Sequence, residues 1–263
     1  MLTQTQRALA TAALLWSGLL FGADTSIRTP VVIAGEDDWA PYSYAHKQQP
    51  GTEQEPQGFS AQLIRAAFAT QHIDVKFSTL PFARCMRLAQ TDKVAGCFNA
   101  TMTDDNRDAY IWHKPPMFRE ELSIFGPPDA ASKPLTQEDL RGKSVAITNG
   151  YTYPSAFMQD PRIRKFPAAS DDNLIQMLLS KRVDYILMNC TPGTLRIQTA
   201  PNARSHVVWR GTLSADDFWI AFSRQHPQGQ QLAHAFSKGL TQLHETGTYQ
   251  RMLDTFRKQV GIH

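Results

Sequence analysis

The chain has 263 residues, of which 42% are apolar, and its 27 basic and 24 acidic side chains leave a net charge of +3. This much apolar material can form a sizeable core, which excludes disordered, fibrous and tail-like classes of protein. The small basic excess is not gathered into a block, so we do not expect a nucleic acid partner.

An uncharged apolar run covers residues 8–23, directly after Arg7. It is too short for a good membrane span and is typical of a secretory signal peptide, which we predict over residues 1–23. The alternative is an uncleaved N-terminal anchor, although no cysteine follows the run to accept a lipid.

The next part of the chain alternates predicted strands and helices. In chain order these are a strand at 31–35, a helix at 58–73, a strand at 75–80, a helix at 81–90 and a strand at 94–99. Short apolar runs bounded by turn residues indicate the strands, and apolar residues at helical spacing indicate the helices. Such alternation predicts a mostly parallel sheet.

A second set of elements follows Pro127 and Pro128. It comprises a strand that ends at Thr148, a helix capped by Ser170, a strand at 182–189, a strand at 217–224 and a long helical region broken at Gly247. The joins between the two sets, at 121–126 and 217–222, are themselves strand-like. We therefore expect one lobe to be inserted into the other across two hinge strands.

The chain contains three cysteines, Cys85, Cys97 and Cys190. In an oxidising compartment they allow one disulfide and one remaining thiol, but the sequence does not choose the pair. Their spacing matches no zinc pattern, and we expect no metal and no cofactor.

Candidate binding residues follow the predicted strands, because ligands bind at the carboxyl ends of strands in open α/β sheets. Trp39 and Tyr42 come after the first strand and offer a flat ring to the apolar part of a ligand. Asn99, Thr101 and Arg107 follow the strand at 94–99, where hydroxyl and amide groups and a guanidinium fork suit a carboxylate.

Two more candidate positions lie in the second set of elements. Gly150 allows an unusual turn, and we expect Tyr151 and Thr152 to open the next helix with free backbone N–H groups for an anion. Asn189 ends the strand at 182–189 and offers a neutral donor and acceptor. No GxSxG, HExxH or Walker motif is present, so we predict no catalytic residues.

Taken together, these segments resemble the polar-amino-acid family of extracellular solute-binding proteins, the periplasmic receptors of ABC importers. The resemblance covers nearly the whole chain after the signal peptide. It rests on the order and spacing of PYSY at 41–44, GFSAQLI at 58–64, VAGCFNATMTDDNR at 94–107, LRGKSVAITNGYTY at 140–153, RVDYILMN at 182–189, DFWIAFSRQHP at 217–227 and LHETGTYQRMLDTF at 243–256.

The resemblance implies an α/β, two-lobed periplasmic-binding-protein-like fold of type II, with the lobes joined by two hinge strands. Lobe 1 would comprise residues 24–126 and 213–263, and lobe 2 residues 127–212. In such proteins an aromatic ring stacks on the ligand, short polar residues and an arginine bind its carboxylate, and a turn in lobe 2 adds N–H donors. Those roles would fall here on Trp39 or Tyr42, on Asn99, Thr101 and Arg107, and on Tyr151 and Thr152.

The sequence departs from the family pattern in two places, one of which is the position that would hold an α-ammonium group. Asn189 stands where the family has an acid, and Ser60 and Gln62 also replace usual acids. A neutral contact in place of an ion pair weakens binding by roughly ten- to a hundredfold. We therefore expect the carboxylate half of the site to be retained, rather than the ammonium half.

The function implied is that of a monomeric periplasmic binding protein, not an enzyme, for a small polar carboxylate, with an amino acid as one candidate. It would deliver this ligand to an ABC transporter permease or a membrane sensor. One alternative is a dehydratase-like periplasmic enzyme, for which Glu36, Asp37 and Asp38 are the acids in a candidate cleft loop. Another is a sensory or interaction domain that binds no ligand.

Overall fold

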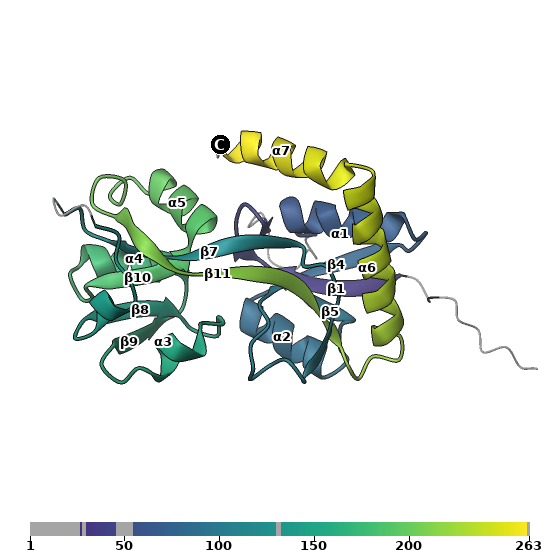
Figure 1. The fold of residues 1–263 in the computed structure, drawn as a ribbon, viewed down its shortest axis with the longest axis horizontal. Coiled ribbons are helices and arrows are strands. Elements are labelled where there is room, and N and C mark those ends of the chain that lie inside the picture. Colours follow the sequence, from purple (N-terminus) through teal and green to yellow (C-terminus); the bar gives the residue numbers. More distant parts are fainter. Residues whose placement is uncertain (1–26, 28–29, 46–54, 130–132, 262–263) are drawn as a thin grey trace, which may run out of the picture.

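The computed structural model describes residue 27 and the ranges 30–45, 55–129 and 133–261, so the predicted signal peptide lies outside it. The described residues form two lobes, with β7 and β11 running from one to the other (Figure 1). Within these ranges no helix is long and apolar enough to cross a membrane.

A nine-stranded sheet passes through both lobes in the order β4-β1-β5-β11-β7-β10-β8-β9, with β6 beside β11. A separate pair is formed by β2 and β3. The strands are β1 (Val31–Glu36), β2 (Asp38–Trp39), β3 (Ser43–Tyr44), β4 (Val75–Leu80), β5 (Gly96–Ala100), β6 (Tyr110–Trp112), β7 (Phe118–Gly126), β8 (Ser144–Thr148), β9 (Arg164–Ala168), β10 (Tyr185–Asn189) and β11 (Val208–Ser223).

Strand directions differ between the lobes and the hinge. In lobe 1, β1 pairs in parallel with β4 and β5, and in lobe 2, β8 pairs in parallel with β9 and β10. The hinge strands β7 and β11 are antiparallel to each other and to the strands beside them. The prediction of a mostly parallel sheet is therefore right within each lobe and wrong at the hinge, because the chain crosses once in each direction.

The packing of β7 shows where this strand passes from the core of lobe 1 to the cores of lobe 2. Phe118 and Phe218 are paired in register and belong to the core of lobe 1. Leu122, Ile124 and Phe125 belong to the cores of lobe 2. On β7 the side chains thus change from the core of lobe 1 to that of lobe 2 between Phe118 and Leu122.

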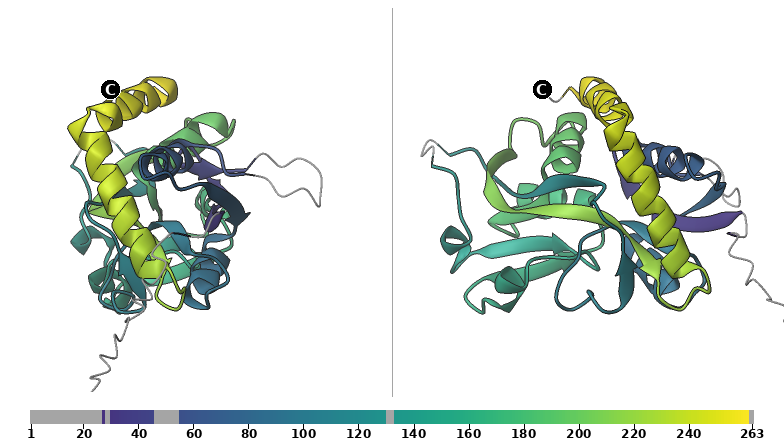
Figure 2. Two further views of the ribbon diagram at one scale, coloured as in Figure 1. Left: turned by 90° about the vertical axis from the view of Figure 1, so that its right-hand side faces the viewer. Right: turned by 45° about the vertical axis from the view of Figure 1, so that its right-hand side comes forward.

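Helices cover both faces of the sheet in each lobe (Figure 2). In lobe 1, α1, α6 and α7 contribute to one core and α2 to another, and in lobe 2, α4 and α5 are separated in the same way from α3 and η1. The helices are α1 (Phe59–Ala69), α2 (Phe82–Gln90), η1 (Glu138–Leu140), α3 (Ser155–Gln159), α4 (Asp171–Leu179), α5 (Cys190–Thr199), α6 (Gly229–Glu245) and α7 (Thr248–Val260).

Local sequence signals explain several of these boundaries. The Ser170 hydroxyl accepts a hydrogen bond from the backbone N–H of Asn173 at 3.3 Å, which confirms it as the N-cap of α4. Gly247 adopts φ 67° between α6 and α7, a left-handed conformation that ends one helix and redirects the chain. The predicted break at Gly247 is confirmed.

The structure also selects the cysteine pair that the sequence leaves open. Cys85 on α2 and Cys97 on β5 form a disulfide with a Cα–Cα distance of 5.6 Å, and both side chains are fully buried. Cys190 is the free thiol and begins α5. The disulfide ties a helix of lobe 1 to the neighbouring central strand.

Replacing both Cys85 and Cys97 by alanine should lower the free energy of unfolding by about 3 kcal/mol, since the bridge closes a short loop in the unfolded chain. Urea denaturation measures this difference, and Cys190→Ala is the control, with little expected change. Equal urea midpoints for the double variant and the unaltered protein would contradict a stabilising role for the bridge.

Candidate functional site

A cavity lies between the lobes, beside the carboxyl ends of β1, β5, β8 and β10. Lobe 1, the hinge strands and lobe 2 all contribute side chains to it. The lining residues are Glu36, Trp39, Phe82, Asn99, Thr101, Leu122, Tyr151, Thr152, Tyr153, Leu187, Met188, Asn189, Asp216 and Phe218. The strand-end rule therefore places most of the predicted binding residues around one space.

The free space in this cavity is small, about 40 Å³. Sites for small organic ligands are usually several hundred Å³ in volume. The conformation is therefore a closed one, and a solute of amino-acid size needs the lobes to separate or the lining side chains to move.

The structure distinguishes Trp39 from Tyr42, the two rings that the sequence offers for stacking. Trp39 lines the cavity and stacks on Phe218 with ring centroids 5.1 Å apart. Tyr42 does not line the cavity. It is buried against Phe118, with centroids 4.6 Å apart, and its hydroxyl donates to a Glu120 carboxylate oxygen. Burial and the nearby Glu120 carboxylate raise the Tyr42 pKa, so Tyr42 remains a neutral structural donor.

Asn99 provides an unpaired donor at the cavity. It lies near the end of β5 with φ 63°, a left-handed conformation that asparagine tolerates better than most residues. The Ser60 hydroxyl donates to Asn99 Oδ1 at 2.6 Å, while the buried Asn99 Nδ2 has no hydrogen-bond partner among the described residues. Thr101 follows directly and also lines the cavity. A buried N–H without a partner is costly, so a ligand oxygen placed there would be stabilised.

Arg107 is not brought to the cavity. Its guanidinium pairs with Asp104 at 2.9 Å, and 58% of its side chain is exposed. Asn106 fixes the turn, accepting from the Thr103 N–H and donating to the Thr101 carbonyl oxygen. The nearby Asp104 competes for the guanidinium, so the geometry gives no arginine fork for a carboxylate.

Tyr151 and Thr152 line the cavity from a loop rather than from a helix. The helix α3 starts at Ser155, and Pro154 stands at its N-cap, so the prediction that Tyr151 and Thr152 open this helix is wrong. A residue before proline is disfavoured in the helical conformation, which explains why the helix begins later. The Tyr153 hydroxyl accepts from the Thr148 N–H at 2.8 Å and holds the loop against β8.

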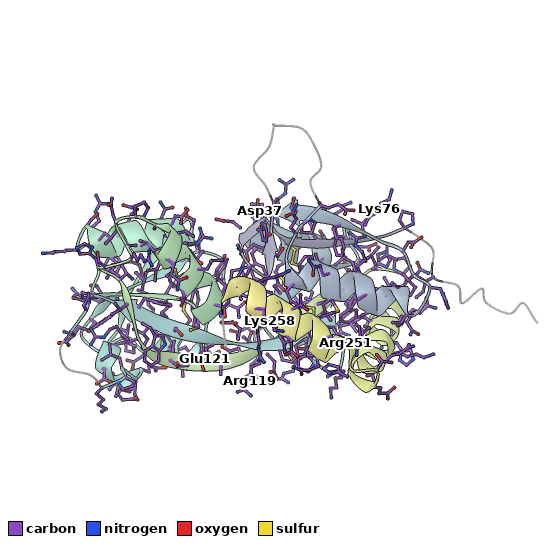
Figure 3. The ribbon with its side chains drawn as sticks, turned by 90° about the horizontal axis from the view of Figure 1, so that it is seen from above. Asp37, Lys76, Arg119, Glu121, Arg251 and Lys258 are labelled. Atoms are coloured by element: carbon purple, nitrogen blue, oxygen red, sulfur yellow. A yellow bond between two sulfur atoms is a disulfide. The ribbon has the colours of Figure 1, made fainter. Side chains whose placement is uncertain are left out.

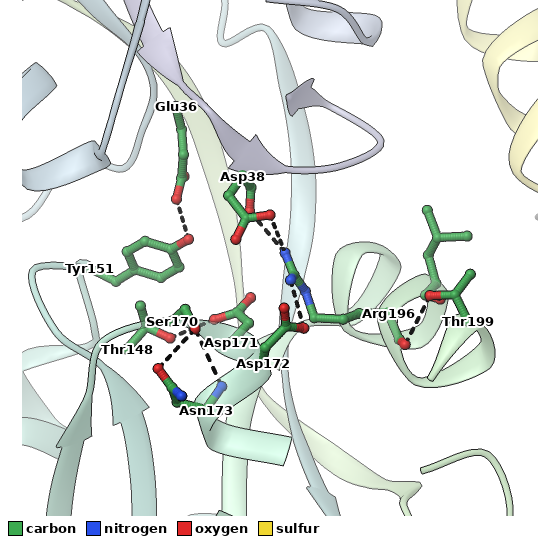
Figure 4. Close-up of polar contacts among 11 residues, drawn as sticks. Glu36, Asp38, Thr148, Tyr151, Ser170, Asp171, Asp172, Asn173, Arg196 and Thr199 are labelled. Atoms are coloured by element: carbon green, nitrogen blue, oxygen red, sulfur yellow. Dashed lines mark hydrogen bonds and ion pairs between the residues drawn. The ribbon is translucent and has the colours of Figure 1, made fainter. Parts of the chain in front are cut away.

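Two polar contacts connect the lobes across the cleft (Figure 4). The Tyr151 hydroxyl donates to Glu36 Oε1. Arg196 on α5 donates to the Asp38 carbonyl and carboxylate oxygens, each at 3.0 Å, and also pairs with Asp172 at 2.8 Å. These contacts stabilise the closed arrangement of the lobes.

Acidic groups are gathered around the Tyr151 contact. Burial raises the Glu36 pKa to about 8, although the Tyr151 hydrogen bond opposes this, and the Asp37, Asp38 and Asp171 carboxylates raise it further. Burial also raises the Asp171 pKa to about 6, even though the Thr148 hydroxyl donates to it. At neutral pH the Glu36 carboxyl is therefore mostly protonated in this conformation.

Asn189 ends β10 and lines the cavity beside these acids. Its Nδ2 donates weakly to the Glu121 carbonyl oxygen at 3.4 Å. Sequence reasoning missed Asp216 and Phe218 on β11, both of which line the cavity. Residues two apart in a strand point to the same face, so Asp216 is expected on the same face as the apolar Phe218.

A glycine allows close approach of the lobes at one edge of the cleft. A Cβ on Gly150 would lie 2.7 Å from the Ala83 Cβ of α2, which is closer than real carbon contacts. Phe82, beside Ala83, packs edge-on against the Tyr151 ring at 5.8 Å. The absence of a side chain at Gly150 thus permits the closed conformation.

Among the residues the structure describes, no group of three or more His, Cys, Asp or Glu side chains could hold a metal ion. The lining side chains instead offer hydrogen bonds, two acids and several aromatic rings. This combination suits reversible binding of a small polar molecule.

The sequence model of the bacterial extracellular solute-binding proteins, family 3, matches residues 31–259. No curated protein matches the chain.

Solved structures share the fold over most of the chain. One is a histidine kinase sensor domain with similarity to periplasmic binding proteins, with 19% identity, 86% of this chain and 95% of that chain covered, and a TM-score of 0.73. Another is an ancestral arginine-binding protein bound to glutamine, with 20% identity, coverage of 88% and 99%, and a TM-score of 0.73. A third is an amino acid ABC transporter substrate-binding protein from Streptococcus pneumoniae bound to L-arginine, with 16% identity, coverage of 88% and 95%, and a TM-score of 0.70. The predicted two-lobed type II fold is confirmed.

Stability should fall as the pH rises from about 6.5 to about 8, because folded Glu36 keeps a proton that it loses in the unfolded chain. The slope should approach 1.4 kcal/mol per pH unit, where about one proton separates the two states. Asp171, with a pKa of about 6, and His113, whose pKa is lowered to about 3 from 6.5, change their contributions mainly below this window.

Urea denaturation at a series of pH values measures this slope. Glu36→Gln should flatten it, whereas the exposed Glu245→Gln should retain it. A free energy of unfolding that is constant or rises over this window would contradict the raised pKa of Glu36.

Gly150→Ala should hinder closure and weaken ligand binding by tenfold or more, because the added methyl group meets Ala83. Gly142→Ala is the matched control, since Gly142 has a similar φ of 79° against 81° but nothing within 4 Å of its would-be Cβ. Both variants should lose about 1 kcal/mol of stability from left-handed backbone strain. Equal affinities in the two variants would show that this contact does not limit closure.

Proposed function

Because the chain belongs to the bacterial extracellular solute-binding proteins of family 3, we propose that it captures a small polar solute carrying a carboxylate, such as an amino acid. The binding site is the cavity between the lobes. The solute is bound and released unchanged, and it is delivered to an ABC importer or to a membrane sensor. Both roles occur among proteins with this fold, as the transporter component and the kinase sensor domain illustrate.

The observation that carries this proposal is the unpaired Asn99 Nδ2 donor at the interlobe cavity. A carboxylate oxygen of the ligand would accept from it. Thr101 and Thr152 line the same cavity, and their hydroxyls would supply further neutral donors. A hydrogen bond to a charged group contributes about 1.5–3 kcal/mol, so these donors can hold a carboxylate without Arg107.

The ring of Trp39 supports the apolar part of the solute in the proposed complex. Trp39 is 2% exposed and is fixed by its stacking on Phe218, so little side-chain conformational entropy is lost when a ligand binds against it. Asn189 contributes a neutral contact from lobe 2. The proposed ligand-binding residues are therefore Trp39, Asn99, Thr101, Tyr151, Thr152 and Asn189, with Tyr42 in a supporting position.

Binding proceeds through lobe closure. A solute that touches Asn99 on lobe 1 and Thr152 on lobe 2 makes more contacts in the closed form than in the open form, so it shifts the equilibrium toward closure. The lobes are proposed as residues 24–126 with 213–263 and residues 127–212. The end of β7 before residue 126 packs on the cores of lobe 2, and the lobes move about the segments where β7 and β11 pass from one lobe to the other. Removal of a signal peptide at residues 1–23 would place the monomer in the periplasm.

A thermal unfolding panel tests the proposal with amino acids, dicarboxylates, amines and short peptides. A ligand at about a hundred times its Kd adds roughly 2.7 kcal/mol of stability and should raise Tm by several degrees. The protein is first unfolded and refolded in urea to remove any solute carried through purification. A panel without any shift would overturn the assignment as a solute-binding protein.

Asn99→Asp should weaken a carboxylate ligand by more than tenfold, since it replaces the free donor with an anionic oxygen and keeps the size of the side chain. Isothermal titration calorimetry measures the affinity. The control is Asn202→Asp, the same chemical change at an exposed position that does not line the cavity, which should leave the affinity unchanged. Unaltered binding by Asn99→Asp would remove Asn99 from the site.

A further inference from the structure

The charged side chains that line the cavity are all acidic. Glu36 and Asp216 line it, and in the part of the chain that the structure describes no lysine, arginine or histidine does so. Arg196, a basic residue of lobe 2 that reaches across to lobe 1, is already bound to Asp38 and Asp172. A ligand carboxylate would thus meet neutral donors only, with two carboxyl groups close by.

Glu36 is a buried acid for which the described part of the chain supplies no cationic partner. Its side chain is held by the Tyr151 hydroxyl (Figure 4), and the negative charges of Asp171, Asp37 and Asp38 act on it. Burying a carboxyl without a counter-charge is unfavourable unless the group stays protonated or a cation approaches it. Tyr151 satisfies one oxygen and leaves the charge uncompensated.

Asp216 brings a second carboxyl group to the cavity from the hinge strand β11. The Ser214 hydroxyl donates to its Oδ2 at 2.6 Å and orients the side chain. The adjacent Asp217 belongs to the same strand and is not among the lining residues. The two neighbouring aspartates therefore differ in their access to the cavity.

Aromatic rings lie beside these acids. Trp39, Phe82, Tyr151 and Phe218 all line the same space. Organic cations bind favourably to aromatic faces, especially where water is excluded, and a combination of acids and rings is suited to ammonium or guanidinium groups. The unpaired Asn99 Nδ2 is a separate sign that the cavity accommodates a ligand, and it can donate a hydrogen bond to a neutral or anionic oxygen.

We propose that the group chiefly recognised in this cavity is an organic cation, a primary amine or a guanidinium, held by Glu36 and Asp216 against the aromatic rings. A molecule that carries this cation but no carboxylate still binds. This inference rests on the proposed function, because it takes the interlobe cavity as the binding site. It reverses the expectation that the carboxylate half of the site is the one retained.

Cation binding is coupled to the release of a proton. Glu36 is mostly protonated at neutral pH in the closed conformation, and a cation beside it favours the carboxylate. The groups that act on Glu36 are the Tyr151 hydroxyl and the acids Asp171, Asp37 and Asp38. The acids disfavour a negative charge on Glu36, and the Tyr151 hydrogen bond favours it but supplies no counter-charge. Affinity for the cation should therefore rise with pH up to about 8.

Calorimetry with matched compounds tests the inference. L-Arginine and agmatine differ only in the carboxylate, as do L-lysine and cadaverine, while glutarate carries carboxylates and no cation. At least one amine should bind no more than a hundredfold more weakly than its amino acid, and glutarate should not bind. Titrations at pH 7 in two buffers of different ionisation enthalpy should show nearly one proton released with the bound amine.

Asp216→Asn should reduce the affinity for the amine at least tenfold, whereas the neighbouring Asp217→Asn should not change it. Glu36→Gln should abolish the proton release. Because the unaltered protein with five compounds already decides the outcome, a variant that fails to fold does not weaken the test.

Binding of glutarate or of the amino acids without binding of either amine would overturn the inference and leave the proposed function intact. Amine binding without proton release, or with equal affinity in the two aspartate variants, would remove the acids from the site and overturn it as well. If none of the five compounds binds, the inference fails, and the broader unfolding panel decides the proposed function separately.

Discussion

The antiparallel pairing of β7 with β11 is the constraint on which the rest of the molecule depends. These strands continue the sheet from one lobe into the other, so the lobes are joined by two paired strands rather than by flexible linkers. Glu120 strengthens this junction from its buried side. One of its carboxylate oxygens accepts from the Tyr42 hydroxyl of lobe 1 and the other from the Thr191 N–H of lobe 2 at 2.8 Å.

Side chains at the start of β7 alternate between buried and exposed positions, so one strand contributes to the junction of the lobes and to the protein surface. Glu120 points inward, while its neighbours Arg119 and Glu121 are exposed (Figure 3). Because the same junction fixes β11, Asp216 and Phe218 reach the cavity from a strand shared by both lobes. The hinge strand β11 therefore lines the cavity as well as joining the two lobes.

The sequence predicts the architecture well because strong local patterns determine it. Apolar runs define the strands, Ser170 and Gly247 mark helix ends, and the strand-end rule brings Trp39, Asn99 and Asn189 to one cavity. These inferences need only the periodicity of side chains and the geometry of an α/β sheet.

The remaining features depend on contacts that local patterns do not determine. Some join side chains far apart in the sequence, and others arise where neighbouring groups compete for one partner. Tyr42 stacks on Phe118 instead of lining the cavity, and Arg107 forms an ion pair with Asp104 instead of reaching the cavity. The pairing of Cys85 with Cys97 requires the docking of α2 on β5, which spacing alone does not determine. The acidic character of the cavity likewise appears only when Glu36 and Asp216, far apart in the chain, line the same space.

The free thiol of Cys190 offers a single site at which an optical reporter can be attached. The other two cysteines are joined in the disulfide, so a thiol-reactive fluorophore would attach at a single position without any mutation. Cys190 directly follows Asn189, which lines the cavity, and it begins the helix whose backbone contacts the hinge glutamate. Burial raises the pKa of this thiol, so mildly alkaline labelling suits it. A dye at this position would sense the relative movement of the lobes through changes in its surroundings.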